Sequence, residues 1–434
     1  MKYLVLLLFL AACSRPATTV EYDNYGGIKS IVREKTGFFR VDSTAGRWLF
    51  VTPEGHGYFA IGANHTGKFL EDSSQSGPYL ARFDGDSTKV REDLYQNYLR
   101  LGYNAGEAYG QHDPYLKTKL PYIAHLDYPQ SDYLKIDIFD KENQQTLYDH
   151  TVAQCQPLRD DKMLIGIAFR DLPAWNKRRM DVVRSLPATA KGKERYLDFL
   201  LERYGSDLAS LNKFYGSRFS SFSEIGKTED WKLAAENEKT AKDDADFMAQ
   251  IAEIWYSTLR RAVNQAAPNH LFLGERHQLR DTPDAVLQVV GKQVDVFLTQ
   301  ALIRSKQRPP EWQTFQPEAY RHEYELTQKP MVIVDWATPF SLGERFDSEH
   351  GPIKDEREAV RDIATWLDEL TELPFVIGHF KCQFIGSHAN DRWFEGKAKR
   401  TTIKDDGTDF DVMSDEIAKS QRKTLQKVYQ KAKK

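Results

Sequence analysis

Carboxyl side chains stand at the ends of several apolar runs in this sequence. Asp171 and Asp335 each close such a run, and Glu107 and Glu275 hold similar positions. Cleavage of a bond between two sugars takes two carboxyl groups, because one protonates the leaving oxygen while the other attacks the sugar or activates water. The pattern therefore predicts acid-base chemistry on a polysaccharide, with Asp171 and Asp335 as the catalytic pair. Glu107 and Glu275 are the reserve candidates.

Polar and aromatic side chains near these carboxyl groups are candidates for substrate binding. They are Asn64, His65, Arg170, Trp175, Arg276, His277, Gln300, Trp336, His379 and Lys381. The guanidinium group matches the oxygens of sulfate and carboxylate, so the cationic members predict an anionic substituent on the polymer. The alternative is that these cations form internal ion pairs with the carboxylates of the same rim. Trp175 and Trp336 either stack on sugar faces or fill space within loops.

The sequence lacks the spacings that are typical of metal and phosphate sites. It has no His-x-x-x-His motif, no pair of closely spaced cysteines and no glycine-rich phosphate loop. Cys155 and Cys382 lie far apart and are expected to be buried thiols. We therefore predict neither a metal nor a cofactor.

The elements that must position these side chains alternate between strand and helix. Short apolar runs are typical of strands that are buried on both faces. They cover residues 58–64, 101–107, 120–125, 163–171, 270–276, 294–300, 330–336 and 375–381. Amphipathic stretches predict helices. These cover residues 88–100, 140–154, 232–266, 309–327, 355–371 and 413–432. Strand and helix in eightfold alternation predict an α/β fold, a (β/α)8 TIM barrel whose strand ends share one rim.

Two elaborations of this barrel are expected. Residues 38–41 and 47–51 predict a β-hairpin before the first barrel strand. Residues 176–230 follow the fourth strand and are too many for a bare loop, so this insertion should contain helices. The barrel domain as a whole would then cover residues 31–434.

The N-terminus has the features of an export signal. Met1 and Lys2 precede an apolar run that is too short to span a membrane as a mature helix. Residues 10–13 (Leu-Ala-Ala-Cys) are similar to a bacterial lipobox. We expect a signal peptide at 1–12, a lipid anchor on Cys13, a tether at 13–30 and a place in the cell envelope, at the outer membrane or facing the periplasm. The alternative is an ordinary signal peptide with an incidental cysteine. A net charge of −3 over 434 residues predicts no attraction to nucleic acid.

Two segments resemble carbohydrate-active enzymes. Residues 37–59, which include Gly-Arg-Trp-Leu-Phe-Val-Thr-Pro-Glu-Gly at 46–55, resemble the N-terminal signature of β-agarases of glycoside hydrolase family fifty. Residues 202–222, with Tyr-Gly, Leu-Asn and Gly-x-x-Phe motifs, are similar to those agarases and to family forty-two β-galactosidases. The resemblance implies a retaining barrel with an Asn-Glu acid/base at strand four and a glutamate nucleophile at strand seven.

The chain departs from this family pattern at both catalytic strands. Alignment on Gly166 and Trp175 puts Asp171 on the asparagine and Leu172 on the acid/base glutamate, and Asp335 stands where the nucleophile is expected. A leucine cannot transfer a proton, so three hypotheses stay open.

The first hypothesis is a hydrolase that uses Asp171 and Asp335, whose short side chains would widen the carboxyl gap and favour inversion. The second is β-elimination on a uronic-acid polymer, with a base among His277, His379 and Lys381 and an arginine that neutralises the carboxylate. The third is a barrel that binds glycans without turnover, since a fold does not fix a function.

Overall fold

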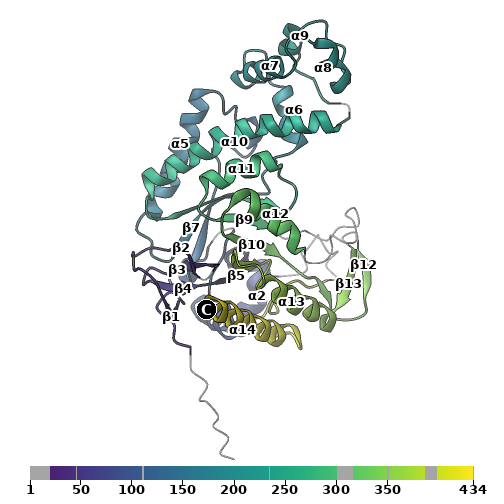
Figure 1. Ribbon diagram of the computed structural model, residues 1–434. Coiled ribbons are helices and arrows are strands. Elements are labelled where there is room, and N and C mark those ends of the chain that lie inside the picture. The colour runs from purple at the N-terminus through teal and green to yellow at the C-terminus, as the bar shows by residue number, and fades with distance from the viewer. Residues whose placement is uncertain are drawn as a thin grey trace, which may run out of the picture.

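The computed structural model describes residues 20–44, 46–109, 112–233, 235–300, 316–348, 351–386 and 398–433. A curled parallel sheet lies at the centre of this part of the chain (Figure 1). It has seven strands in the spatial order β5-β14-β10-β9-β8-β7-β6. The strands are β5 (Ala60–Ala63), β6 (Tyr122–Leu126), β7 (Leu164–Asp171), β8 (Leu271–Gln278), β9 (Phe297–Gln300), β10 (Met331–Trp336) and β14 (Val376–Lys381). Each overlaps an apolar run of the sequence, because strands covered on both faces need apolar side chains on both.

The remaining apolar run, residues 101–107, does not form a regular strand. Its backbone nevertheless runs between β5 and β6, where the amide of Asn104 donates to the carbonyl of Ile61 at 2.9 Å and the amide of Gly106 donates to that of Pro121 at 2.8 Å. The side-chain oxygen of Asn104 accepts the amide of Ile61 at 2.7 Å. A side chain thus takes a position that a backbone carbonyl occupies in a regular ladder.

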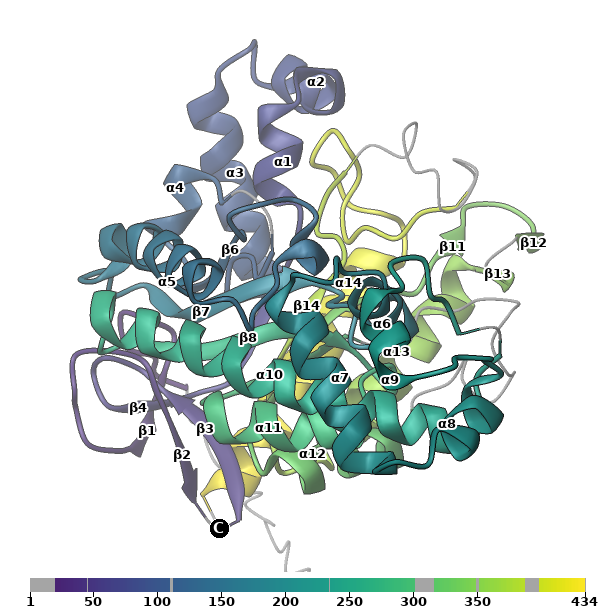
Figure 2. The same cartoon turned by 90° about the horizontal axis from the view of Figure 1, so that it is seen from above.

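Helices cover the outside of the sheet. They are α3 (Ser87–Arg100), α5 (Lys141–Cys155), α10 (Glu238–Ala266), α11 (Asp284–Gln293), α12 (Pro317–Thr327), α13 (Glu356–Leu370) and α14 (Met413–Ala432). Figure 2 shows α5, α10 and α11 side by side along the sheet. Side chains of Asp86, Asp140 and Asp355 cap α3, α5 and α13 by accepting backbone amides of the first turn. These three helices thus begin within one residue of the predicted stretches, whereas α11 was not predicted.

The apolar core has two layers because the sheet is curled. Side chains such as Ile165, Leu273, Leu298 and Val332 fill the inside of the curl. A larger set, which includes Trp255 of α10, packs between the sheet and the helices. Alternate residues of each strand therefore enter different environments.

An antiparallel sheet lies at the N-terminal end of the parallel strands. Its order is β1-β4-β3-β2, with bounds β1 (Ile28–Val32), β2 (Arg40–Thr44), β3 (Arg47–Val51) and β4 (His56–Tyr58). Strands β2 and β3 pair with Arg40 opposite Val51. Phe50 and Tyr58 of this sheet join the apolar cluster inside the curl, so the sheet closes that end.

The expected tether extends too far into the chain. Strand β1 begins at Ile28, which is buried, and Asp23 accepts hydrogen bonds from the Thr52 hydroxyl at 2.5 Å and from the backbone amide of Gly27 at 2.7 Å. The polar composition of residues 14–30 predicted a solvated tether, but the pairing of β1 with β4 and the hydrogen bonds of Asp23 override this prediction for the residues from 20 onward. Cys13 and the expected signal peptide lie outside the described residues.

The insertion after β7 is helical. It contains α6 (Lys177–Arg184), α7 (Lys191–Tyr204), α8 (Leu208–Tyr215) and α9 (Phe222–Lys227). The guanidinium of Arg184 is buried, bonds to Asp244 of α10 and lies between the rings of Tyr196, Tyr215 and Trp231. These contacts anchor the insertion on the long helix.

The other described elements are short. They are α1 (Thr66–Glu71), α2 (Ser73–Arg82), α4 (Pro114–Lys117), the 3-10 turns Tyr133–Lys135 and Gln156–Leu158, β11 (Phe340–Ser341), β12 (Phe346–Ser348) and β13 (Gly351–Asp355). Within the described ranges, none of the helices combines the length and the apolar character needed to cross a membrane.

Candidate active site

Strained backbone gathers at the C-terminal ends of the parallel strands. His65 after β5, Leu172 after β7, Arg280 after β8 and Asp335 in β10 have φ angles of 68°, 49°, 67° and 53°. L-residues rarely adopt this left-handed region, which costs about 1–2 kcal/mol per residue. Such strain clusters at functional sites, where the surrounding structure maintains it. This edge of the sheet is therefore the candidate site.

Arg276 of β8 lies at the centre of the site and is completely buried. Its Nη2 donates to Oδ2 of Asp335 and lies 3.6 Å from Oδ1 of Asp171, so one nitrogen contacts both carboxyl groups. The ring of Tyr109 covers the guanidinium, with its centroid 4.3 Å from Cζ. The structure thus brings together the two aspartates that the sequence singled out and one of the predicted cations.

Asp335 is held as an anion. Asn64 donates to its Oδ1, and the amide of Ala108 fixes Asn64 by donating to the side-chain oxygen at 2.9 Å. Burial opposes the charge, but Arg276, His65 and the hydrogen bond from Asn64 outweigh burial and keep the pKa of Asp335 below its usual value.

Asp171 is in the opposite situation. Burial raises the pKa of its carboxyl group above the usual value, although Arg276 lowers it, and the negative charge of Asp335 raises it again. Gln300 of β9 donates to its Oδ1. The side chain is 28% exposed, against 14% for Asp335. Two carboxyl groups whose pKa values are pushed apart are suited to act as acid and base.

Glu107 stabilises the loop after β5 through hydrogen bonds to its backbone amides. It is buried, and its carboxylate accepts the amides of His65 at 2.9 Å and Gly67 at 2.6 Å. Burial raises the pKa of Glu107 to about 8. The reserve candidate therefore holds the loop after β5, which carries His65.

Tyr109 is a site residue that the sequence did not single out. Its half-buried ring meets those of His65 and His125 at centroid distances of 5.6 Å and 4.5 Å. It follows the irregular segment 101–107 by two residues and ends no apolar run, so the pattern of strand ends missed it. An aromatic residue two positions after an expected strand end was the available signal.

Glu275, His277 and Trp175 lie on the other side of the sheet. Glu275 accepts hydrogen bonds from Tyr128 at 2.5 Å, from Trp175 Nε1 at 2.9 Å and from Tyr256 of α10. His277 Nε2 contacts the Tyr256 hydroxyl at 3.1 Å, and burial lowers the pKa of His277 to about 3. Neighbours of an inward-pointing residue point outward in a strand. The inward position of Arg276 therefore turns Glu275 and His277 away from the rim, and Trp175 lies with them because it bonds to Glu275.

Trp336 and His379 also point outward, toward α13. Trp336 Nε1 donates to His379 Nδ1 at 3.1 Å, and its ring packs against Trp366 at 4.7 Å. Lys381 is buried as well and donates to the carbonyls of Gln383, at 3.1 Å, and Arg400. Burial lowers the pKa of Lys381 to about 7.

Arg170 is the exposed member of the predicted basic set. Its guanidinium lies 4.9 Å from the ring of Tyr133. The expected contact of these cations with an anionic substituent is therefore corrected for Arg276, which is paired internally, and for His379 and Lys381, which are bonded within the protein.

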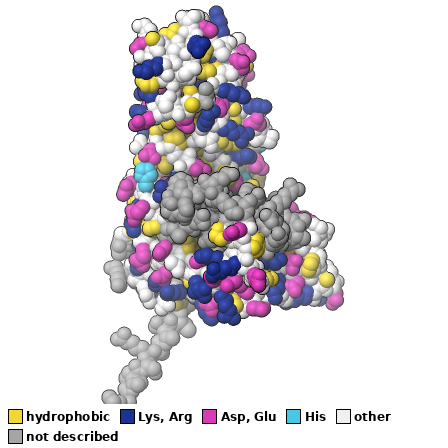
Figure 3. All heavy atoms as spheres, turned by 90° about the vertical axis from the view of Figure 1, so that its right-hand side faces the viewer, with side chains coloured by type: hydrophobic (Ala, Val, Ile, Leu, Met, Phe, Trp, Pro, Cys, Tyr) yellow, Lys and Arg dark blue, Asp and Glu magenta, His cyan; other side chains and the backbone are white. Residues whose placement is uncertain are grey.

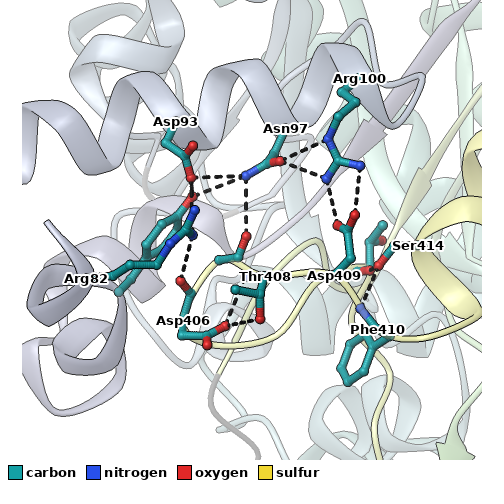
Figure 4. Close-up of polar contacts among 12 residues, drawn as sticks. Arg82, Asp93, Asn97, Arg100, Asp406, Thr408, Asp409, Phe410 and Ser414 are labelled. Carbon is teal, nitrogen blue, oxygen red and sulfur yellow. Dashed lines mark hydrogen bonds and ion pairs between the residues drawn. The ribbon is translucent and has the colours of Figure 1, made fainter.

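A polar clamp fixes the loop that follows β14. Arg100 of α3 forms a pair of hydrogen bonds with Asp409 at 2.6 Å and 2.9 Å, and Arg82 of α2 donates to the carbonyl of Asp406 at 3.0 Å (Figure 4). Asn97 lies between them and contacts the carbonyl of Gly407 at 3.5 Å. This loop also carries the carbonyl that receives Lys381, so α2 and α3 stabilise one wall of the site.

His65, Asp335 and Cys382 are close enough to be considered as metal ligands, with their donor atoms within 4.8 Å of one another. Both carboxylate oxygens of Asp335 already accept hydrogen bonds, and the charges of Arg276 and nearby Arg400 act on this cluster. Burial also raises the pKa of the Cys382 thiol to about 12. These surroundings favour the protonated thiol over metal ligation.

No model of a protein family matches the chain. β-Agarase B of Vibrio sp. (strain JT0107) is 20% identical over 457 aligned positions, which cover 86% of this chain and 47% of that protein. The chain thus spans about half the length of this curated relative.

Solved structures show the same fold. An agarase superposes with a TM-score of 0.75 and 16% identity over 94% of this chain and 68% of that one, and an exo-β-agarase with 0.72 and 16% over the same shares. A β-galactosidase from the psychrophilic Marinomonas ef1 reaches 0.55 and 11%, over 84% and 59%. The chain is therefore a homologue of β-agarases and shares their α/β fold.

Proposed function

We propose that this protein is a glycoside hydrolase that cleaves agar-like galactan fragments, with Asp171 as the general acid and Asp335 as the nucleophile. The observation that carries the proposal is that two carboxyl groups on one guanidinium have pKa values shifted in opposite directions. Glycosidases use such a pair, in which one group keeps its proton and the other stays ionised. Homology to agarases supports the same reaction class.

The spacing of the pair supports retention of configuration. Inverting enzymes leave room for a water molecule between carboxyl groups about 6.5–9.5 Å apart, whereas retaining enzymes hold them about 5–5.5 Å apart. Here Asp171 and Asp335 both contact Nη2 of Arg276, which favours the closer arrangement. In this proposal the shared arginine offsets the widening that shorter side chains would cause.

The reaction would proceed in two steps. The Asp335 carboxylate attacks the anomeric carbon while Asp171 gives its proton to the leaving oxygen. Asp171 then takes a proton from water, whose oxygen attacks the same carbon and releases Asp335.

We also propose that residues 104–107 take the place of the eighth strand of a closed barrel. Their backbone hydrogen bonds to the segments on both sides support this proposal.

The substrate is proposed to be uncharged next to the cleaved bond. Arg276 is neutralised by carboxylates, and Lys381 donates to backbone carbonyls, so neither offers a free cation there. Among the described residues on the face that Figure 3 displays, acidic and basic side chains are interspersed. Arg170 at the rim remains the candidate contact for a sulfate or carboxylate farther along the polymer.

A glycan-binding protein without turnover is the second candidate. Leu172, 43% exposed, stands where the resemblance implies the acid/base glutamate, and this observation favours it. β-Elimination has less support, because His277 and His379 face the helices and Lys381 is bonded to carbonyls.

We also propose that the protein is exported and carries a lipid on Cys13, which the sequence of residues 1–13 supports. Metabolic labelling with a fatty acid should mark the wild-type chain and not Cys13→Ser.

The function is tested by incubating the purified protein with oligosaccharides of agar, carrageenan, porphyran and ulvan. New reducing ends without the absorbance of an unsaturated uronate are expected on agar, and Asp335→Asn should abolish them. Exposed Asp230→Asn is the matched control and should leave them unchanged. New reducing ends together with the absorbance of an unsaturated uronate would indicate a lyase. Sugar binding with neither signal would indicate a glycan-binding protein without turnover.

A further inference from the structure

We propose that Arg276 is a positioning residue that the two carboxyl groups share, and that it moves from Asp335 to Asp171 when Asp335 carries the sugar. This inference rests on the proposed hydrolase function. It assigns to one buried arginine the change of Asp171 from acid in the first step to base in the second.

The geometry permits this exchange with little movement. Nη2 of Arg276 is bonded to Asp335 and lies 3.6 Å from Oδ1 of Asp171, just beyond a hydrogen bond. Its Nε and Nη1 are buried and have no hydrogen-bond partner among the described residues. The ring of Tyr109 fixes the plane of the guanidinium. A small shift would complete the bond to Asp171.

The chemistry of the intermediate supplies the reason for the shift. When Asp335 bonds to the anomeric carbon, its carboxylate becomes a neutral ester and no longer offsets the charge of Arg276. Burial still raises the pKa of Asp171, but the negative charge of Asp335, which also raises it, disappears, whereas Arg276, which lowers that pKa, remains. Asp171 has just given its proton to the leaving group, so the arginine stabilises the anion that must accept the proton of water.

The other groups around the pair do not replace Arg276 in this role. The titratable and charged side chains around Arg276 and the two aspartates are His65, Tyr109, His125, Arg170, Cys382 and Arg400. Burial lowers the pKa of His65 and His125 and raises those of Tyr109 and Cys382, so these four are neutral near pH 7. Arg170 is exposed to solvent, which screens its charge.

The first test compares the wild type with Arg276→Gln and Arg276→Lys on agar oligosaccharides. In Arg276→Gln, both Asp335 in the free enzyme and Asp171 in the intermediate lose a stabilising cation. The acid limb of the pH profile of kcat should therefore move to higher pH, and the glycosyl-enzyme should accumulate in acid-quenched samples examined by mass spectrometry. Arg276→Lys keeps the charge and should keep the limb near its wild-type position. Exposed Arg178→Gln is the matched control and should change neither readout.

The second test uses the wild type alone, so it does not depend on the folding of a buried variant. The intermediate is trapped with a 2-deoxy-2-fluoro galactoside, and the Asp171 carboxyl is titrated by carbon-13 NMR. Its pKa should be lower in the trapped form than in the free protein. An equal or higher pKa overturns the role of Arg276, as does an unchanged pH profile in a folded Arg276→Gln. These outcomes leave the hydrolase proposal standing, whereas a wild type that cleaves no galactan overturns both.

Discussion

Asp335 and Trp336 are neighbours in the sequence, yet their side chains lie on opposite sides of the sheet. The carboxylate of Asp335 meets Arg276 inside the curl, while Trp336 packs on Trp366 of α13 outside it. Val334 also points inward, so the strict alternation of the strand breaks at Asp335, where φ is 53°. A single left-handed residue thus delivers the carboxylate to the site and removes the tryptophan from it.

General acid catalysis by Asp171 predicts a dependence on the leaving group. Asp171→Asn should lower kcat/KM on agar oligosaccharides by about a thousandfold, within the usual contribution of a general acid. Aryl galactosides with acidic phenols need no proton donor in the first step, so their kcat/KM should fall by less than about tenfold. Their kcat should still drop, because the second step loses its base. Steady-state kinetics on both substrates check this, and an equal loss of kcat/KM on both would assign Asp171 to a different task.

Leu172→Glu separates the hydrolase from the silent binding protein. Its side chain is exposed at the rim, so a carboxylate there would meet solvent and substrate. If Asp171 already donates the proton, the added glutamate should not raise turnover on agar oligosaccharides. Leu172→Gln is the control, because glutamine matches glutamate in size and carries no charge. A gain that appears only with glutamate would mean that the wild type lacks a working acid.

Glu107 predicts that stability declines as the pH rises. Its pKa is about 8 in the folded protein, against 4.5 as the ordinary value. A raised folded pKa gives stability that is fully present below the unfolded value and is lost as pH rises through the folded one. The melting temperature of the wild type should therefore fall between about pH 5 and pH 8. Glu107→Gln cannot ionise, so its melting temperature should fall less over that range, as differential scanning calorimetry would show.

Trp175→Phe tests the outward position of the Glu275 cluster. The substitution removes the indole N–H that donates to Glu275 and leaves a buried carboxylate oxygen without this partner. Unfolding free energy should drop by about 1 kcal/mol, the usual net contribution of one hydrogen bond, because the same oxygen keeps the Tyr256 hydroxyl as a donor. Denaturant titration measures the loss. Because Trp175 lies away from Asp335, kcat/KM of the folded variant on agar oligosaccharides should stay near the wild-type value; a selective loss of kcat/KM would return Trp175 to the substrate site.

The strands and most helices could be predicted from the sequence because their signals are local. The apolar run 330–336 indicates a strand buried on both faces, and the amphipathic stretch 355–371 indicates a helix buried on one, in agreement with β10 and α13. Segment 101–107 has the same apolar composition as a strand, yet Asn104 replaces part of its ladder with side-chain bonds. This use of a side-chain hydrogen bond in place of a backbone one depends on the position of Ile61, which is distant in sequence.

The sequence by itself determined which residue types occupy the strand ends, and hence that carboxylates, an arginine and amides would be available at one edge of a sheet. Only the tertiary structure decided which of them face inward. Side-chain direction alternates along a strand, so a register shift beside Gly274 in β8 or a left-handed residue at Asp335 changes which neighbour enters the site. Arg276 therefore joins Asp171 and Asp335, while Glu275 one position away is enclosed by tyrosine and tryptophan beneath a helix.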